Sequence, residues 1–406
     1  MIIRSITYFC NPGWPLDQGK LQAAGTFLAE AKVAFEGAGY PVQSLRLATM
    51  PFLQMLGGDK ISETPKLAEA LERAIRSVGI AYAAVGPAQP ELPSSYAVIP
   101  EAIAASQNIF FSGVAADTRF GISLSGLQAC AQVITRCSRV TPDGFANLRF
   151  AALANLKAGS PFFPAAYHDR DEPSFALATE AADLAVDTFT NARTVTDGQW
   201  AMVSALEEHG RKLTTVGDAL GRRFSIVFGG IDFSLAPFPE ESRSIGTALE
   251  RMGAPKAGLH GSLAAAAILA ESLERARFPR AGFSGLMLPV LEDAVLAKRA
   301  AEGVLSVKDL LLYSAVCGTG LDTVPLPGDT TSEQITAVLL DLSALALRLN
   351  KPLTARLMPI PGKKAGDPTH FDFDYFANSR VLALESAGLN PIFTETRRFT
   401  LAPHHS

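Results

Sequence analysis

The sequence is poor in charged residues and has no concentration of positive charge. Only 19% of its 406 residues are charged, and the formal net charge is -4. A nucleic-acid-binding surface needs clustered positive charge, whereas the basic pairs here are scattered and typical of solvated ends. We therefore expect no nucleic-acid partner.

Long apolar runs and cysteine patterns are also missing. The most apolar stretch, "GSLAAAAILAESLERA", reaches Glu271 well before the roughly 20 apolar residues that a membrane span requires. The beginning "MIIRSITYF" lacks the pattern of a secretory signal. The four cysteines have no CxxC spacing, and Cys130 and Cys137 would lie on one helix about 10 Å apart, too far for a disulfide. These features predict a cytoplasmic protein with neither a membrane partner nor a disulfide.

Several motifs that identify an activity are absent. No P-loop occurs, no G-x-G-x-x-G follows the first apolar run, and no H-E-x-x-H is present. "GFSGL" (282–286) does not have the spacing of a G-x-S-x-G nucleophile elbow. We therefore predict no cofactor; a divalent metal held by carboxylates stays open, without support from ligand spacing.

Apolar runs alternate with helix-like stretches along the chain, which predicts an α/β fold with a largely parallel sheet. In the first half we expect strands in "IIRSITYF", "VQSLRLA", "IAYAAVG", "NIFFSGV" and "ANLRFAALAN". Two long helical stretches, roughly 174–193 and 198–220, lead to a second half. That half contains "RFSIVFGGIDFSLAP", helices near 241–252, 261–276, 291–301, 306–314 and 332–347, and the strand "TARLMPI". The halves, about 1–195 and 196–406, are similar in kind and suit two half-barrels or two lobes that share one core.

The segment "AVCGTGLDTVPLPGDTTSEQI" (315–335) is the most unusual in the chain. Gly318 and Gly320 would leave backbone amides unshielded beside Cys317, which favours a reactive thiolate. We expect Cys317 to face a cavity, with Asp329 fixed on the far side of the same loop. A small buried hydrophobe is an equally good interpretation of Cys317, and the glycines would then serve close packing. Thr330 and Glu333 predict a capping box that starts the next helix.

Other candidate groups lie in polar turns. His168, in "YHDRDE", could act with a neighbouring carboxylate as a base or a metal ligand, although a charged surface loop explains the run as well. Asp232 and Ser234 follow a glycine pair at the carboxyl end of a strand, where ligands collect in α/β folds, or they simply cap a turn. Ser262 suits a helix N-cap and Ser284 a glycine-flanked turn. Glu292 and Asp293 match the dipole of the following helix.

Several of these segments together resemble one known family. "DFSLAP", "GLHGSLAAAAILAE", "GFSGLMLPVLEDAVL", "VCGTGLDTVPLPGDT" and "LTARLMPIPGKKAGD" occur in the order and spacing of domain-of-unknown-function family 711, the UPF0210 group. "SPFFPAAYH" and "IRSITYF" extend the resemblance over nearly the whole chain. The family's chemistry is unassigned.

The resemblance implies a fold similar to the pyruvate formate-lyase-like enzymes, a ten-stranded α/β barrel of two five-stranded halves. The glycyl radical of those enzymes is not implied for this chain. Its last 30 residues contain a single glycine, Gly388, and the cysteine pair of a finger loop is absent. The segment "HFDFDYF" (370–376) departs from the family's usual glycine-rich segment, which puts a shared ligand there in doubt.

We therefore expect a single barrel domain that acts, without radical chemistry, on a small anionic metabolite as a lyase, transferase or hydrolase. The catalytic candidates are Cys317, His168, Asp232 and Asp329. The substrate-binding candidates are Arg356, Lys363, Ser234, Ser262 and Ser284. A non-catalytic small-molecule binding or regulatory protein on the same fold is the alternative. We also expect a homo-oligomer.

Overall fold

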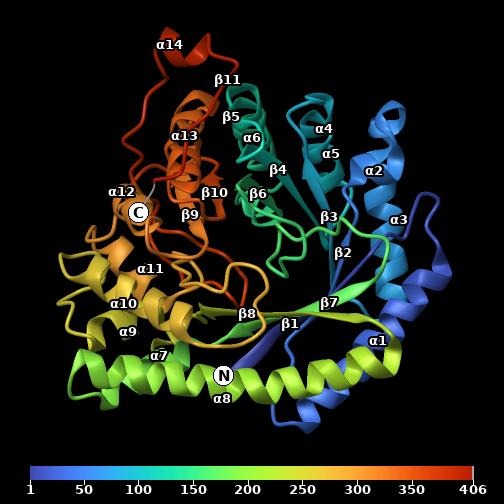
Figure 1. Ribbon diagram of the computed structural model, residues 1–406. Coiled ribbons are helices and arrows are strands. Elements are labelled where there is room, and N and C mark those ends of the chain that lie inside the picture. Colours follow the sequence, from blue (N-terminus) through green and yellow to red (C-terminus); the bar gives the residue numbers. More distant parts are fainter. Residues whose placement is uncertain (405–406) are drawn as a thin grey trace.

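One large curved sheet organises the computed structural model, which describes residues 1–404. Its main path runs β8-β7-β1-β2-β3-β4-β6-β10-β9, and two short strands, β5 and β11, pair beside β4. The helices lie on the outer side of the curve, whereas long loops occupy the inner side (Figure 1). The prediction of an α/β fold with a mostly parallel sheet is confirmed.

The first block of the sheet contains five parallel strands. They are β1 (Ile2–Cys10), β2 (Leu45–Thr49), β3 (Tyr82–Ala88), β4 (Ile109–Asp117) and β6 (Phe150–Ala154). The connecting helices are α1 (Gln18–Gly37), α2 (Phe52–Leu56), α3 (Thr64–Ser77), α4 (Ser94–Ala97), α5 (Ile99–Ala104) and α6 (Leu124–Cys137), with β5 (Gly121–Ser123) before α6. Cys130 and Cys137 both lie on α6, as predicted.

The second block runs in the opposite direction. Strand β7 (Ser174–Glu180) is antiparallel to β1 and parallel to β8 (Val227–Ala236), and β10 (Leu353–Ile360) is antiparallel to β6 and parallel to β9 (Gly320–Pro327). Its helices are α7 (Ala182–Asn191), α8 (Val195–Phe224), α9 (Ile245–Arg251), α10 (Ser262–Arg275), α11 (Ala294–Ala301), α12 (Val307–Tyr313) and α13 (Ser332–Arg348). The chain ends with α14 (Pro391–Thr394) and β11 (Arg398–Phe399). Between β8 and β9, isolated parallel bridges join Ile231 to Arg280 and Pro289 to Asp322.

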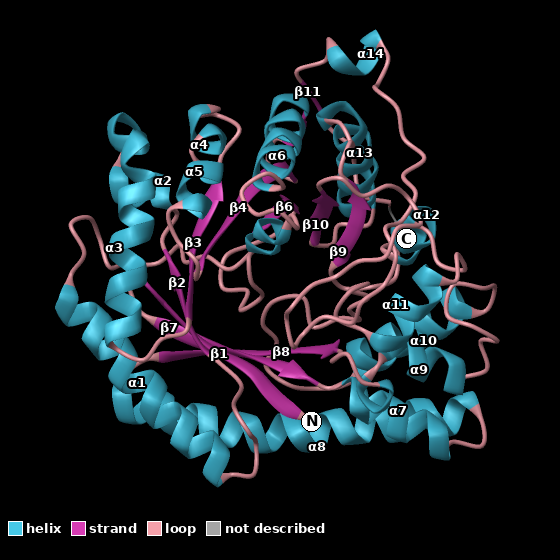
Figure 2. Ribbon diagram, turned by 180° about the vertical axis from the view of Figure 1, so that it is seen from behind, coloured by secondary structure: helices cyan, strands magenta, loops and turns pink. Residues whose placement is uncertain are grey.

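Apolar spacing explains why the helices pack outside the sheet. In α3 the buried residues Leu67, Leu71 and Ile75 recur every four positions, so they form one stripe towards the sheet. On β1, Ile6 and Tyr8 belong to the main core, whereas Phe9 packs in a separate cluster with Ala48 and other inner-face residues. Figure 2 shows the same arrangement from behind, with α8 running along one side of the molecule.

Loops close the inner side of the sheet at two places. Phe162 and Phe163 come from the loop between β6 and β7. Each packs in a different cluster of buried apolar side chains on the inner side of the sheet. After β10, Phe371 and Phe376 pack with Met358 and Ile360 in a further cluster. The inner face therefore has apolar clusters of its own, built from strand side chains and aromatic loop side chains.

Four local predictions are wrong. Residues 174–180 form β7 rather than a helix, because Phe175 and Leu177 pack in the main core while the small Ala176 joins an inner-face cluster. Residues 320–327 form β9, which pairs with β10 at the end of the main path of the sheet and contains two prolines. The capping box belongs to Thr331 and Gln334, one residue later than predicted. Gly261, not Ser262, is the N-cap of α10.

Gly318 has a steric role. A Cβ on Gly318 would lie 2.7 Å from the Cα of Gly285, and the Gly318 amide donates to the carbonyl of Leu286 at 2.7 Å. Two backbone segments therefore touch at this point, which only paired glycines allow.

We expect Gly318→Ala to lower the free energy of unfolding by about 1–3 kcal/mol, because the added methyl group must push two backbones apart. Urea denaturation monitored by circular dichroism measures this. Gly37→Ala is the matched control: a Cβ there meets nothing within 4 Å, so this variant should be unchanged or more stable by up to about 1 kcal/mol. Equal stability of Gly318→Ala and the wild type would contradict the steric role.

Candidate functional site

A cavity of about 500 Å³ lies on the inner side of the curved sheet. This volume is in the range of small-molecule sites. Its wall combines charged and aromatic side chains from the strands and from the segments that connect them. The charged residues are Arg4, Arg46, Arg149, Asp232, Glu292, Asp322 and Arg356.

Three arginines reach the cavity from three strands that are otherwise apolar. Arg4 lies on β1, Arg46 on β2 and Arg356 on β10. Burying a charge inside a protein is costly unless a partner neutralises it. How each guanidinium is satisfied therefore decides what the cavity can bind.

Arg4 and Arg356 share carboxylate partners. Glu292 accepts from both guanidinium groups, from Arg4 through Oε2 and from Arg356 Nη2 through Oε1 at 2.6 Å. Asp322 accepts from Arg356 Nε at 2.6 Å. The order Arg4–Glu292–Arg356–Asp322 is thus an alternating chain of buried charges. Burial alone would raise the pKa of Glu292, but Arg4 and Arg356 together lower it below its ordinary value.

Arg46 is satisfied differently. Its Nε donates to Ser44 Oγ at 2.9 Å, and its guanidinium lies 5.1 Å from the ring centre of Phe163 and 5.8 Å from that of Tyr82. Within residues 1–404 it takes part in no ion pair. Burial, with a smaller contribution from the nearby Arg4, lowers the pKa of Arg46 to about 10. Its terminal nitrogens thus provide a cationic group that is not directly paired with a carboxylate of the cavity wall.

Asp232 lies in the same wall and organises a turn. Its carboxylate accepts from the amides of Phe283 and Ser284 at 3.0 and 2.9 Å and from the hydroxyl of Ser234. Burial raises the pKa of Asp232 above its ordinary value even though these donors oppose the shift. The pKa of Asp322 is also above its ordinary value. Burial raises it and the negative charge of Glu292 adds to the increase, whereas Arg356 opposes it.

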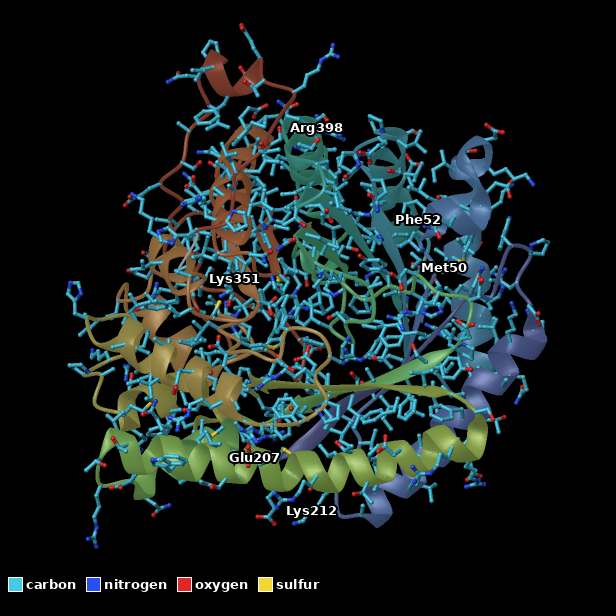
Figure 3. The ribbon with its side chains drawn as sticks, in the orientation of Figure 1. Met50, Phe52, Glu207, Lys212, Lys351 and Arg398 are labelled. Carbon is cyan, nitrogen blue, oxygen red and sulfur yellow. The ribbon has the colours of Figure 1, made fainter. Side chains whose placement is uncertain are left out.

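The candidate thiol of Cys317 does not line this cavity. Cys317 is 1% exposed and belongs to the main hydrophobic core, and its sulfur accepts from the amide of Gly320 at 3.4 Å. Lys351, labelled in Figure 3, donates to the carbonyl of Cys317 rather than to its sulfur. Asp329 is exposed, on the surface loop before α13. The structure therefore does not bring Cys317 and Asp329 together in the cavity.

The remaining candidate residues also divide into those in or beside the cavity wall and those elsewhere in the structure. Ser234 lines the cavity, and Ser284, beside it, donates to the carbonyl of Ile231 at 3.0 Å. Ser262 is buried elsewhere, where it donates to the carbonyl of Lys256 at 3.2 Å, and Lys363 is half-buried outside the cavity wall. His168 is 2% exposed, and its backbone amide donates a hydrogen bond to the carbonyl of Thr49. Burial lowers the pKa of His168, and its Nε2 has no hydrogen-bond partner.

Arg4, Arg46, Glu292 and Asp322 were not predicted as site residues. The signal was present: "IIRSITYF", "SLRLA" and "TARLMPI" each place one arginine inside an apolar strand. Glu292 was assigned to the helix dipole, but it neutralises two arginines, while its neighbour Asp293 is the N-cap of α11. No group of three or more potential metal ligands occurs among residues 1–404. Within that range, no helix is long and apolar enough to cross a membrane.

Cys317 should react slowly with iodoacetamide, because both it and Cys130 are inaccessible. We expect folded protein to show no faster alkylation of Cys317 than of Cys130 between pH 6 and 9, followed by peptide mass spectrometry. Protein denatured in urea, in which both thiols are exposed, is the control. Fast, pH-dependent labelling of Cys317 alone would support a catalytic thiol.

Replacing Glu292 tests the chain of buried charges. We expect Glu292→Gln to lose about 3–5 kcal/mol of stability at pH 7, because two arginines are left without their shared carboxylate. The folded pKa of Glu292 is below its ordinary value of 4.5, so its contribution is complete above pH 4.5 and is lost as the pH falls through the folded pKa.

The difference between the wild type and Glu292→Gln in denaturant unfolding should therefore shrink below about pH 4.5. Glu385→Gln is the matched control, since Glu385 pairs with Lys308 on the exposed surface and should have no measurable effect. A difference between the wild type and Glu292→Gln that does not change with pH would contradict the ionised bridge.

Known proteins are similar to this sequence over most of its length. The family model "Uncharacterised ACR (DUF711)" matches residues 1–378. The UPF0210 protein of Ruminiclostridium cellulolyticum is 30% identical over 352 residues, which cover 82% of this chain and 77% of the relative. The UPF0210 protein of Methanococcoides burtonii is 30% identical over 353 residues, with the same coverage. That of Pyrobaculum arsenaticum is 34% identical over 262 residues, covering 62% of this chain and 57% of the relative. The chain therefore belongs to the DUF711 family of uncharacterised proteins.

Proposed function

We propose that this protein is an enzyme that acts on a small anionic molecule in the cavity, without radical chemistry. The observation that carries the proposal is Arg46. Arg4 and Arg356 form ion pairs with Glu292 and Asp322, whereas Arg46 forms no ion pair within residues 1–404 and contacts one hydroxyl and two aromatic rings. A guanidinium with open terminal nitrogens matches the geometry of a carboxylate or a phosphate.

The cavity also offers groups for proton transfer. Asp232 and Asp322 line its wall, and burial raises the pKa of each. A carboxyl group with a raised pKa gives up and takes back a proton nearer to neutral pH than a solvated one does. Lyase, transferase and hydrolase chemistry all need such a group beside the bound substrate.

We further propose that the sheet closes as a ten-stranded barrel, with residues 280–289 in the place of the tenth strand. The bridges to β8 and β9 at the two ends of this segment support the closure. The reversed directions of the two blocks would then correspond to the two halves of a barrel like that of pyruvate formate-lyase.

A non-catalytic binding protein is the second candidate, and one observation favours it. Asp232 is already engaged by three amides and a serine hydroxyl, and Asp322 by Arg356. A carboxylate whose acceptor sites are filled holds a pocket in shape without transferring protons. The two candidates share the anion site at Arg46 and differ only in whether the bound molecule is changed.

Arg46 tests the shared part. We expect a panel of small carboxylates and phosphate esters to raise the melting temperature of the wild type. Arg46→Met should weaken the affinity for the best of these at least ~10-fold, measured by isothermal titration calorimetry, because a hydrogen bond to a charged group contributes about 1.5–3 kcal/mol. Arg46→Lys should retain part of the binding, since it keeps the charge but loses the fork.

Arg136→Met is the matched control, because Arg136 lies on the outer surface of α6 and not in the cavity. Equal binding by Arg46→Met and the wild type would overturn the anion site. Catalysis is followed separately, by proton NMR of each bound carboxylate in D₂O. Wild-type protein should exchange or convert at least one of them, and Asp322→Asn should not. Binding without any change in the whole panel would favour the non-catalytic candidate.

A further inference from the structure

We infer that the anion taken by this cavity is a carboxylate attached to a planar ring, and that Phe373 and Tyr375 select the ring. This inference rests on the proposed function, because it requires that Arg46 receive the carboxylate. It adds the chemical class of the rest of the ligand, which the charged groups by themselves do not determine.

The cavity wall is unusually aromatic. Seven of its side chains are aromatic rings, and they come from strands and loops that are distant in sequence: Tyr82, Phe110, Phe145, Phe162, Phe163, Phe373 and Tyr375. Aromatic rings favour offset or edge-to-face contacts with another ring, and each such contact contributes more than its buried area alone. An aliphatic ligand of the same volume would fill this wall without making those contacts.

Two aromatic groups with different roles make up most of this wall. In the first, Phe110 packs edge-on against both Tyr82 and Phe163, with ring centres 5.6 and 5.4 Å apart. Tyr82 and Phe163 also contact the Arg46 guanidinium. This group is occupied in holding Arg46, so it fixes where the carboxylate binds.

The second group is Phe145 with Phe373 and Tyr375. Phe373 lies 5.1 Å from Phe145 and 5.1 Å from Tyr375 between ring centres. Phe373 and Tyr375, both from the 370–376 segment, line the cavity but are only half-buried. Asp372 and Asp374, which alternate with them, are exposed to solvent. The segment thus contributes rings to the cavity and keeps its charges outside.

The charge balance favours a single carboxylate. Around Arg4 and Arg356 the two carboxylates of Glu292 and Asp322 compensate the two guanidinium groups. Arg149, also in the wall, donates to the carbonyls of Ser106 and Ile103 at 2.6 and 2.9 Å. Both terminal nitrogens of Arg149 are thus occupied by carbonyls, whereas Arg46 bonds only through Nε. Arg46 therefore offers the open fork in the wall, and one carboxylate satisfies it in a bidentate manner. The remaining surface of the ligand then meets aromatic side chains.

Benzoate, cyclohexanecarboxylate and acetate test this inference, with calorimetric dissociation constants for each. Benzoate and cyclohexanecarboxylate have similar size and the same charge, but only benzoate is planar. We expect the wild type to bind benzoate about 3- to 10-fold more tightly than cyclohexanecarboxylate, which corresponds to one or two ring contacts. In Phe373→Leu, and in Tyr375→Leu, this preference should fall towards unity while acetate binding stays unchanged.

Phe393→Leu is the matched control, because Phe393 is 40% exposed on α14 and lies outside the cavity; it should keep the preference for benzoate. Equal affinity of the wild type for benzoate and cyclohexanecarboxylate would overturn the ring inference, and Arg46-dependent binding of both would leave the proposed anion site standing. If none of the three carboxylates binds in a manner that depends on Arg46, the ring inference fails, and the wider panel of carboxylates and phosphate esters decides the proposed anion site separately. The wild-type preference is measured without any substitution, so it decides the matter even if a variant does not fold.

Discussion

The alternating charges Arg4–Glu292–Arg356–Asp322 are the interaction on which the rest of the structure depends. In the order of the sheet, four strands separate β1, which carries Arg4, from β10, which carries Arg356. In a flat sheet these strands would be about 24 Å apart, at about 4.8 Å per strand. A single carboxylate, Glu292, nevertheless contacts both arginines. The sheet must therefore curve strongly enough for side chains from β1 and β10 to reach the same carboxylate across the interior.

That curvature sets two further requirements. The segment that carries Glu292 has to pass close to the turn after α12, and the contact between Gly285 and Gly318 makes the approach possible. The inner space is also partly filled. Burying these ion pairs removes their solvation, which the pairing geometry and additional hydrogen bonds must offset. The loop that carries Phe162 and Phe163 and the segment that carries Phe371 and Phe376 supply that filling.

The same arrangement explains why one position in the wall is suited to a ligand. Glu292 is shared by two arginines, Asp322 pairs with Arg356, and Asp232 accepts from backbone amides and a serine hydroxyl. The arginine on the neighbouring strand β2 is therefore left without an ion pair. Aromatic rings can stabilise such a guanidinium partially, and an incoming anion can do so more fully. Arg46 is in this situation, and the proposals on anion binding and on ring selection follow from it.

Local patterns in the sequence determined most of the secondary structure. The helices near 261–276, 306–314 and 332–347, the apolar strands of the first half and the shared helix of Cys130 and Cys137 follow from periodicity and capping, which act over a few residues. The same reasoning failed for residues 174–180 and 320–327. Side chains on both faces of these two strands are buried, and such strands lack the alternation that marks a half-buried strand.

The site was determined less by the sequence than by the tertiary structure. Asp232, Ser234 and Arg356 could be selected from their turns and strands, and they do line the cavity. The lone arginines of "IIRSITYF" and "SLRLA" were visible as charges in apolar strands, but their partners were not. Glu292 lies 288 residues from Arg4 and 64 from Arg356. Only the curvature of the sheet brings these three together, and only their pairing shows that Arg46 is left with a free charge.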